Sequence, residues 1–179
     1  MKFTFDWLKD HLETKQPLSS IVETLSMIGL EVDDVEDRGE RLASFKVGKV
    51  ISTKKHPGAD RLQLCIVDCG DGEPAQVVCG APNVRSGLKG IFAPPGTYIP
   101  GINLTLKKSK IRGEDSNGML LSEREMGISD DHEGIVELKN DAAIGTPAPV
   151  AMGLSDPVID VSLTPNRQDC SGVRGIARD

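Results

Sequence analysis

The sequence has 179 residues, 38% of them hydrophobic and 27% charged, which suits one medium domain or two small ones and argues against a disordered chain. Its formal net charge is −6, but residues 41–112 hold twelve of the 21 basic residues and only four acidic ones. That stretch carries +8, whereas residues 1–40 carry −6 and residues 113–179 carry −8. A basic stretch in an acidic protein indicates a polyanionic partner such as nucleic acid.

The residues at the start of the chain and the overall composition argue against several classes. No apolar run approaches the ~18 residues of a membrane span, so no membrane partner is expected. The first residues lack the basic and apolar regions of a signal peptide, which predicts a cytoplasmic location. Aromatic residues make up only 3% of the chain, which argues against a nucleic-acid surface built from several stacking rings.

The four cysteines do not form a recognisable metal-binding pattern. Cys65, Cys69, Cys79 and Cys170 show no CxxC spacing, and a disulfide framework is not expected without a secretion signal. We therefore predict no metal site and interpret these residues as buried thiols.

Residues 1–40 predict a short strand, two helices and a second strand. The first strand covers residues 2–5 and precedes a helix capped by Asp6. The second helix covers about 20–28, because Ser20 and Glu23 form a capping-box pattern and Gly29 suits a left-handed cap. A strand over 31–36 follows. This segment is too small to bury a core by itself.

From residue 45 the sequence changes to short strands separated by turn residues. Strands are predicted over 45–53, 61–68, 75–79, 89–93 and 105–111, with proline–glycine breaks at 94–96 and 100–101. A helical turn over 122–126 and a last strand over 135–138 complete the region. The pattern favours a five-stranded OB-fold β-barrel, and a sandwich remains possible on spacing alone.

Residues 156–179 return to an α+β pattern. A strand over 158–163 leads to an exposed turn at 164–167, and Asp169 or Ser171 begins a helix that is still open at the last residue, as expected for part of a longer protein. We predict a mainly β, α+β protein in which residues 1–40 and 152–179 form a small split α+β domain. The OB-fold barrel, residues 41–151, is inserted between its two parts.

Five motifs make the prediction more specific: HPGADRL from His56, VCGAPNV from Val78, KIRG from Lys110, SNGMLLSE from Ser116 and TPNRQDC from Thr164. In this order and spacing the chain resembles the N-terminal part of the β subunit of bacterial phenylalanyl-tRNA synthetases. The middle resembles the tRNA-binding OB domain of stand-alone tRNA-binding proteins and methionyl-tRNA synthetases. The flanking segments, MKFTFDWLKDHL and TPNR, favour the β subunit.

The resemblance implies an N-terminal fragment with no catalytic residue and no cofactor of its own. Adenylate formation and aminoacyl transfer then belong to the α subunit, and hydrolytic editing to later domains of the β subunit. For the whole enzyme it implies ATP, magnesium and an assembly of two α and two β subunits. The implied partner of this part is tRNA, with no DNA partner.

The candidate tRNA-binding residues are mostly cations of the central stretch: Lys54, Lys55, Arg61, Asn83, Arg85, Lys107, Lys108, Lys110 and Arg112. Lys108, Lys110 and Arg112 would share one face of a strand, as tracking of a phosphate backbone requires, with Lys107 opposite Arg112. The alternatives are lysines that protect an edge strand, a solvated loop, and an Asn83 that bonds its own turn.

Two other functional hypotheses remain open from the sequence. The barrel could be a structural module that braces the subunit with little tRNA contact, or the chain could be a stand-alone tRNA-binding protein. The turn at Asn166 and Arg167 could contact later domains or cap the following helix. His56, His132 and the acidic residues 130–133 show no catalytic or calcium-binding spacing.

Overall fold

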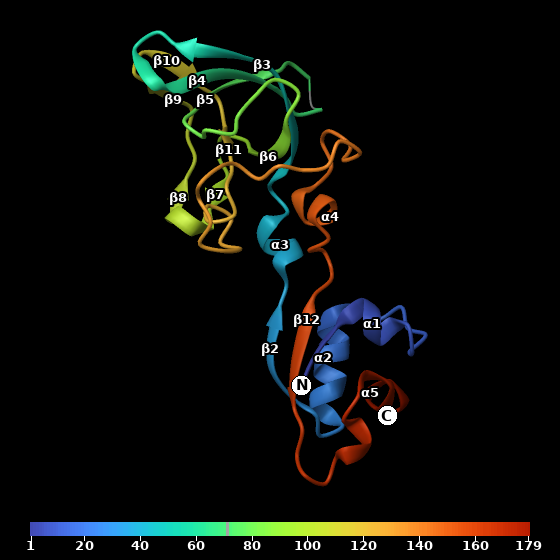
Figure 1. Cartoon of the computed structure of the whole chain (residues 1–179). Helices are drawn as coiled ribbons and strands as arrows, with labels where there is room; N and C mark the ends of the chain where they lie inside the picture. The colour runs from blue at the N-terminus through green and yellow to red at the C-terminus, as the bar shows by residue number, and fades with distance from the viewer. Residues whose placement is uncertain (71) are drawn as a thin grey trace. The chain divides into compact units, whose positions relative to one another are not determined.

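The computed structural model describes residues 1–70 and 72–179, which divide into two compact units (Figure 1). One unit combines Met1–Glu40 with Gly153–Asp179, and the other is Arg41–Met152. The fold class is as predicted: mostly strand, with few helices and a five-stranded antiparallel barrel sheet.

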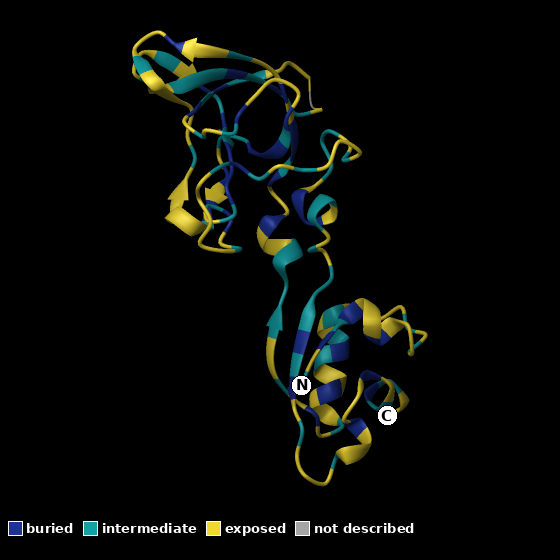
Figure 2. Cartoon of the chain, in the orientation of Figure 1, coloured by how far each residue is buried: buried dark blue, intermediate teal, exposed yellow. Residues whose placement is uncertain are grey.

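The unit formed by the two ends of the chain contains a three-stranded antiparallel sheet packed against short helices. The sheet order is β1 (Lys2–Thr4), β12 (Val158–Ser162), β2 (Glu31–Glu36). Helices α1 (Phe5–Lys9), α2 (Leu18–Met27) and α5 (Val173–Arg178) supply apolar faces to the same core, which appears dark blue in Figure 2. Ile159 and Val161 of the central strand are fully buried there.

The helices of this unit begin at other residues than the sequence predicted. Thr4 caps α1, because its Oγ1 accepts a hydrogen bond from the Trp7 amide at 3.2 Å, so the Asp6 cap was wrong. Pro17 occupies the cap position of α2, and Ser20 lies inside the helix without a capping box. Gly29 adopts φ +84°, which confirms the left-handed cap.

The last helix also differs from the prediction. A short 3₁₀ turn, η2 (Gln168–Cys170), comes first, and α5 then starts after Gly172 without a side-chain cap. Neither Asp169 nor Ser171 caps it. Asp169 instead pairs with Arg167, and the Ser171 hydroxyl donates to the Gln168 carbonyl oxygen at 2.5 Å.

The barrel sheet of the second unit has the strand order β11-β6-β3-β4-β5, antiparallel throughout. Its strands are β3 (Lys46–His56), β4 (Ala59–Asp68), β5 (Ala75–Cys79), β6 (Lys89–Ala93) and β11 (Met119–Leu120). The two edges approach each other, since the Asn117 amide donates to the Gln76 carbonyl at 2.8 Å and the Val78 amide to Ser116 Oγ at 3.2 Å. This nearly closes the barrel, as an OB-like fold requires.

The barrel core is apolar and includes two of the thiols. Val50, Val67 and Val77 are fully buried, together with Cys65. Burial raises the pKa of the Cys65 thiol to about 12 and also raises that of Cys79. All four cysteines are free thiols, and three of them are buried.

The region predicted as the fifth barrel strand, 105–111, is divided between two short hairpins instead. A first hairpin joins β7 (Tyr98–Ile99) to β8 (Leu104–Thr105) through η1 (Pro100–Ile102). A second joins β9 (Ser109–Ile111) to β10 (Glu114–Ser116). The chain reverses between β9 and β10 because Arg112 and Gly113 have φ of +51° and +94°, the positive values of a tight hairpin.

The last two predicted elements of this unit have different outcomes. Residues 123–127 form a turn, in which the Met126 amide donates to the Ser122 carbonyl at 3.4 Å, in agreement with the helical turn predicted over 122–126. Residues 135–138 are not a strand, although the Leu138 amide donates to the Lys89 carbonyl at 2.8 Å.

The remaining helices are α3 (Arg38–Leu42) and α4 (Ala148–Met152). No helix within residues 1–70 and 72–179 has the length and apolar character of a membrane span.

Candidate nucleic-acid interface

His56 ties the β3–β4 hairpin to the β9–β10 hairpin. Its Nδ1 accepts a hydrogen bond from the Gly58 amide at 3.0 Å, so its proton lies on Nε2, which donates to the Ile111 carbonyl at 3.0 Å. A guanidinium nitrogen of Arg112 donates to the Gly58 carbonyl at 3.3 Å. These contacts hold the two hairpins together, and we call them the linked hairpins.

The linked hairpins present five exposed cations. Lys54 and Lys55 lie just before His56, the last residue of β3, and Arg61 lies near the start of β4; among the described residues, none of the three has an ion pair or a side-chain hydrogen bond. Lys110 lies 3.8 Å from Asp115 in an exposed pair that contributes little. A phosphate can bind to Lys54, Lys55 or Arg61 without breaking an ion pair or a hydrogen bond within the protein.

Lys107 and Lys108 lie in the segment between β8 and β9. Both are exposed, and neither pairs with any residue that the structure describes. The prediction that they share one continuous strand with Lys110 and Arg112 was wrong, because the strand begins only at Ser109 and ends before the positive φ of Arg112. The four residues remain consecutive along a path that leads from the first hairpin to the second.

A shallow hollow of about 400 Å³ adjoins the linked hairpins. Lys55 and Arg61 line it with Asp60, Gln63 and the turn at 80–82. Two cations and one carboxylate therefore face this hollow. Gln63, which the sequence prediction did not include, is a half-buried residue of β4.

Asn83 and Arg85 have structural partners. The side-chain amide of Asn83 donates from Nδ2 to the Ile135 carbonyl at 2.8 Å, and its Oδ1 accepts from the Ile135 backbone amide at 3.0 Å. The Asn83 side chain therefore bonds a distant segment and not its own turn. Arg85 donates to Glu137 at 3.1 Å, and this hydrogen bond lowers the pKa of Glu137. The hollow beside Asn83 is lined by carboxylates, which would repel a phosphate: Glu123, Asp131, Glu133 and Glu137.

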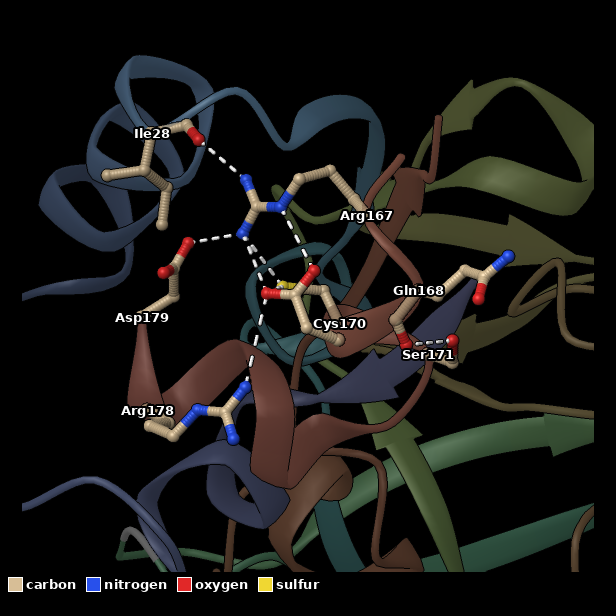
Figure 3. Close-up of polar contacts among 8 residues, drawn as sticks. Ile28, Arg167, Gln168, Cys170, Ser171, Arg178 and Asp179 are labelled. Atoms are coloured by element: carbon tan, nitrogen blue, oxygen red, sulfur yellow. Dashed lines mark hydrogen bonds and ion pairs between the residues drawn. The ribbon is translucent and has the colours of Figure 1, made fainter. Parts of the chain in front are cut away.

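The turn at 164–166 is exposed as predicted, but the side chain of Arg167 at its end is only 17% exposed (Figure 3). Its guanidinium donates to the Ile28 carbonyl at the end of α2, at 2.9 Å, and pairs with Asp169 and Asp179. Cys170 Sγ lies 2.9 Å from the same guanidinium. Asp169, Cys170 and Asp179 form the one group of potential metal ligands among the described residues, and Arg167 already supplies a cation to it.

The chain matches the family described as "Putative tRNA binding domain" over residues 45–147, which is more than half of its length. It is 57% identical over 180 residues to a phenylalanine–tRNA ligase beta subunit from Rhodopseudomonas palustris, and 55% identical over 179 residues to one from Brucella abortus. Both comparisons cover 100% of this chain and 22% of the relative, so the chain spans about a fifth of the length of these relatives.

Among solved structures, the chain is similar to a MetRS related protein from Pyrococcus horikoshii. The two are 25% identical with a TM-score of 0.42, over 58% of this chain and 87% of that chain. The five-stranded barrel, its cationic hairpins and the match over 45–147 lead to one conclusion: this chain belongs to the tRNA-binding domain family.

Proposed function

We propose that the Arg41–Met152 unit binds tRNA through the cations of the linked hairpins and of the β8–β9 segment. The mechanism is electrostatic: several lysines and arginines hold the phosphate backbone and read its spacing, without catalysis. The observation that carries the proposal is the set of unpaired cations, Lys54, Lys55, Arg61, Lys107 and Lys108, next to hairpins fixed by His56 and Arg112.

Asn83 and Arg85 are not part of the proposed surface, although the sequence suggested them. Their side chains hold Ile135 and Glu137 and lie next to an acidic hollow. Binding there would cost the existing hydrogen bonds and oppose phosphate to carboxylate.

The test is a salt titration of the 179-residue chain with tRNA and with an unstructured RNA of equal length. Replacing Lys107, Lys108 and Lys110 together by glutamine should weaken binding and reduce the slope of log K against log salt by about 2 to 3, at ~0.7–0.9 per lost contact. A matched control replaces three exposed cations outside residues 41–112, Lys15, Lys139 and Arg174, and should leave the slope unchanged. An equal slope in both triple variants would contradict the proposed surface.

We further propose that this part serves a phenylalanine–tRNA ligase as auxiliary tRNA-binding region of the β subunit. The identity of 57% to such a subunit supports this. The whole enzyme, in the cytoplasm, would consist of two α and two β subunits and use ATP and magnesium. We assign ATP and magnesium to other parts of the enzyme and no cofactor to this one, as the resemblance to the β subunit implies.

A second candidate function is a structural one, in which the barrel braces the subunit and contacts little RNA; a stand-alone tRNA-binding protein would be a third. The acidic charge of the flanking residues favours the structural role. It predicts that the chain ignores tRNA at physiological salt, which the same titration measures.

A further inference from the structure

The β7–β8 hairpin exposes three large apolar side chains. Tyr98, Ile102 and Leu104 are 52%, 44% and 51% exposed. Tyr98 is the only tyrosine of the chain, and its ring lies on the outer face of the hairpin, while the neighbouring Thr97 and Ile99 are buried. A ring exposed on this scale is available for contact with a ligand.

The hairpin that carries the ring is firmly held. The Gly101 amide donates to the Glu125 carbonyl at 2.9 Å, and a Cβ atom at Gly101 would lie 1.7 Å from the Arg124 carbonyl oxygen. Only glycine permits this close approach. The Tyr98 hydroxyl also bonds Asn103 Oδ1 at 2.8 Å, which fixes the ring across the turn. A ring that is already ordered loses little entropy when a base stacks on it.

Unpaired cations follow the hairpin directly in the chain. Tyr98 pairs with Thr105, and the following Leu106 remains bonded to Thr97, with its amide 2.8 Å from that carbonyl. Lys107 comes directly after Leu106, so its backbone begins beside Thr97, the residue before Tyr98. Lys108 then leads to the β9–β10 hairpin. In Figure 1, β7 and β8 lie at the opposite end of the barrel from β9 and β10.

We propose that Tyr98 is a stacking site for one unpaired base of the bound RNA, with the adjoining phosphates on Lys107 and Lys108. This inference rests on the proposed function and adds a base contact to a surface otherwise made of phosphate contacts. The lysines favour nucleic acid over a protein partner, because they place positive charge, free of acidic neighbours in ion-pair distance, beside an aromatic face.

The experiment compares three variants of the 179-residue chain on tRNA and on a fully paired RNA duplex of equal length. Tyr98→Leu keeps apolar bulk but removes the ring, and should weaken tRNA binding about 5- to 150-fold, the range for one lost base–aromatic stack. Tyr98→Phe keeps the ring but loses the hydrogen bond to Asn103 that orders it, so it should bind tRNA more tightly than Tyr98→Leu and less than about fivefold more weakly than the parent chain. The control, Trp7→Leu, removes an aromatic ring that is 49% exposed in the other unit, and should have no effect.

Two readouts separate this inference from the proposed function. Loss of a stack lowers affinity without changing the salt slope, and leaves binding to the duplex unchanged because a duplex offers no unpaired base. If the parent chain binds tRNA with a steep salt slope and Tyr98→Leu binds equally well, the stacking site is wrong and the surface function stands. If the parent chain does not bind tRNA, the proposed function is wrong, and the stacking site, which rests on it, is wrong as well.

Discussion

At the scale of single residues, Arg167 connects the end of α2, 139 residues earlier in the chain, to two carboxylates close to it in sequence. Its guanidinium satisfies the Ile28 carbonyl at the C-terminal end of α2, which lacks a partner within the helix, and neutralises Asp169 and Asp179 beside η2 and α5 (Figure 3). A planar guanidinium can bond three partners at once, whereas an ammonium acts as one compact charge. The position therefore requires arginine and not merely a cation.

We predict that Arg167→Lys lowers the midpoint of thermal unfolding more than Arg174→Lys, a control at an exposed arginine for which the structure gives no side-chain partner. The hydrogen bond from Arg167 lowers the pKa of Asp169, so the folded state holds this proton less tightly than the unfolded state. The contribution is therefore present above the ordinary aspartate pKa of 3.8 and disappears as pH falls below it. Calorimetry at pH 7 and near pH 3 should show the difference between the variants shrinking at the lower pH; a constant difference would contradict this role.

At the scale of elements, the sequence predicted best where one pattern decides the structure. Residues 31–36, 75–79 and 89–93 have the predicted bounds, because their flanking turns leave few other choices. It failed where a backbone torsion or a distant partner decides. The predicted fifth strand is interrupted at 106–108, where Leu106 bonds Thr97, and Pro17 displaces the predicted start of α2 from Ser20.

The candidate site shows the same limit. Lys54, Lys55 and Arg61 could be chosen because the loop between the first two strands of an OB-fold borders its cleft. The roles of Asn83 and Arg85 could not, since their partners Ile135 and Glu137 lie 52 residues away. Tyr98 could not be predicted from composition. The small number of aromatic residues argued against base stacking, whereas the structure exposes the ring of Tyr98 on the β7–β8 hairpin.

The docking of the β7–β8 hairpin can be tested at Gly101. An added methyl group at this position would overlap the Arg124 carbonyl, so Gly101→Ala should destabilise the barrel by about 1–3 kcal/mol, as overpacking does. Gly58→Ala is the matched control, because its Cβ would meet the nearest atom at an ordinary 3.7 Å; it should change the free energy of unfolding by less than about 0.5 kcal/mol. Urea titration of both variants measures the difference, and equal midpoints would show that the hairpin is not held at Gly101.

At the scale of the whole molecule, the apolar cores belong to separate parts of the chain. Phe3, Leu8 and Ile159 contribute to one cluster, while Val50, Cys65 and Phe92 contribute to another. The positive charge is concentrated in the central stretch, so the unit that would meet RNA differs in charge from the residues at both ends. A separate core for each unit allows each to fold on its own apolar contacts.

We therefore propose that residues 1–40 with 152–179 and residues 41–151 unfold as separate cooperative domains. The only tryptophan, Trp7, reports on the first by fluorescence, and amide hydrogen exchange in β3 and β6 reports on the second. Arg167→Lys should shift the fluorescence transition and leave the exchange of β3 and β6 unchanged, because its contacts all lie in the first unit. Gly101→Ala should do the reverse. If either variant shifted both signals equally, the chain would unfold as one cooperative structure. In two domains that unfold independently, a loss of stability in one leaves the unfolding of the other unchanged.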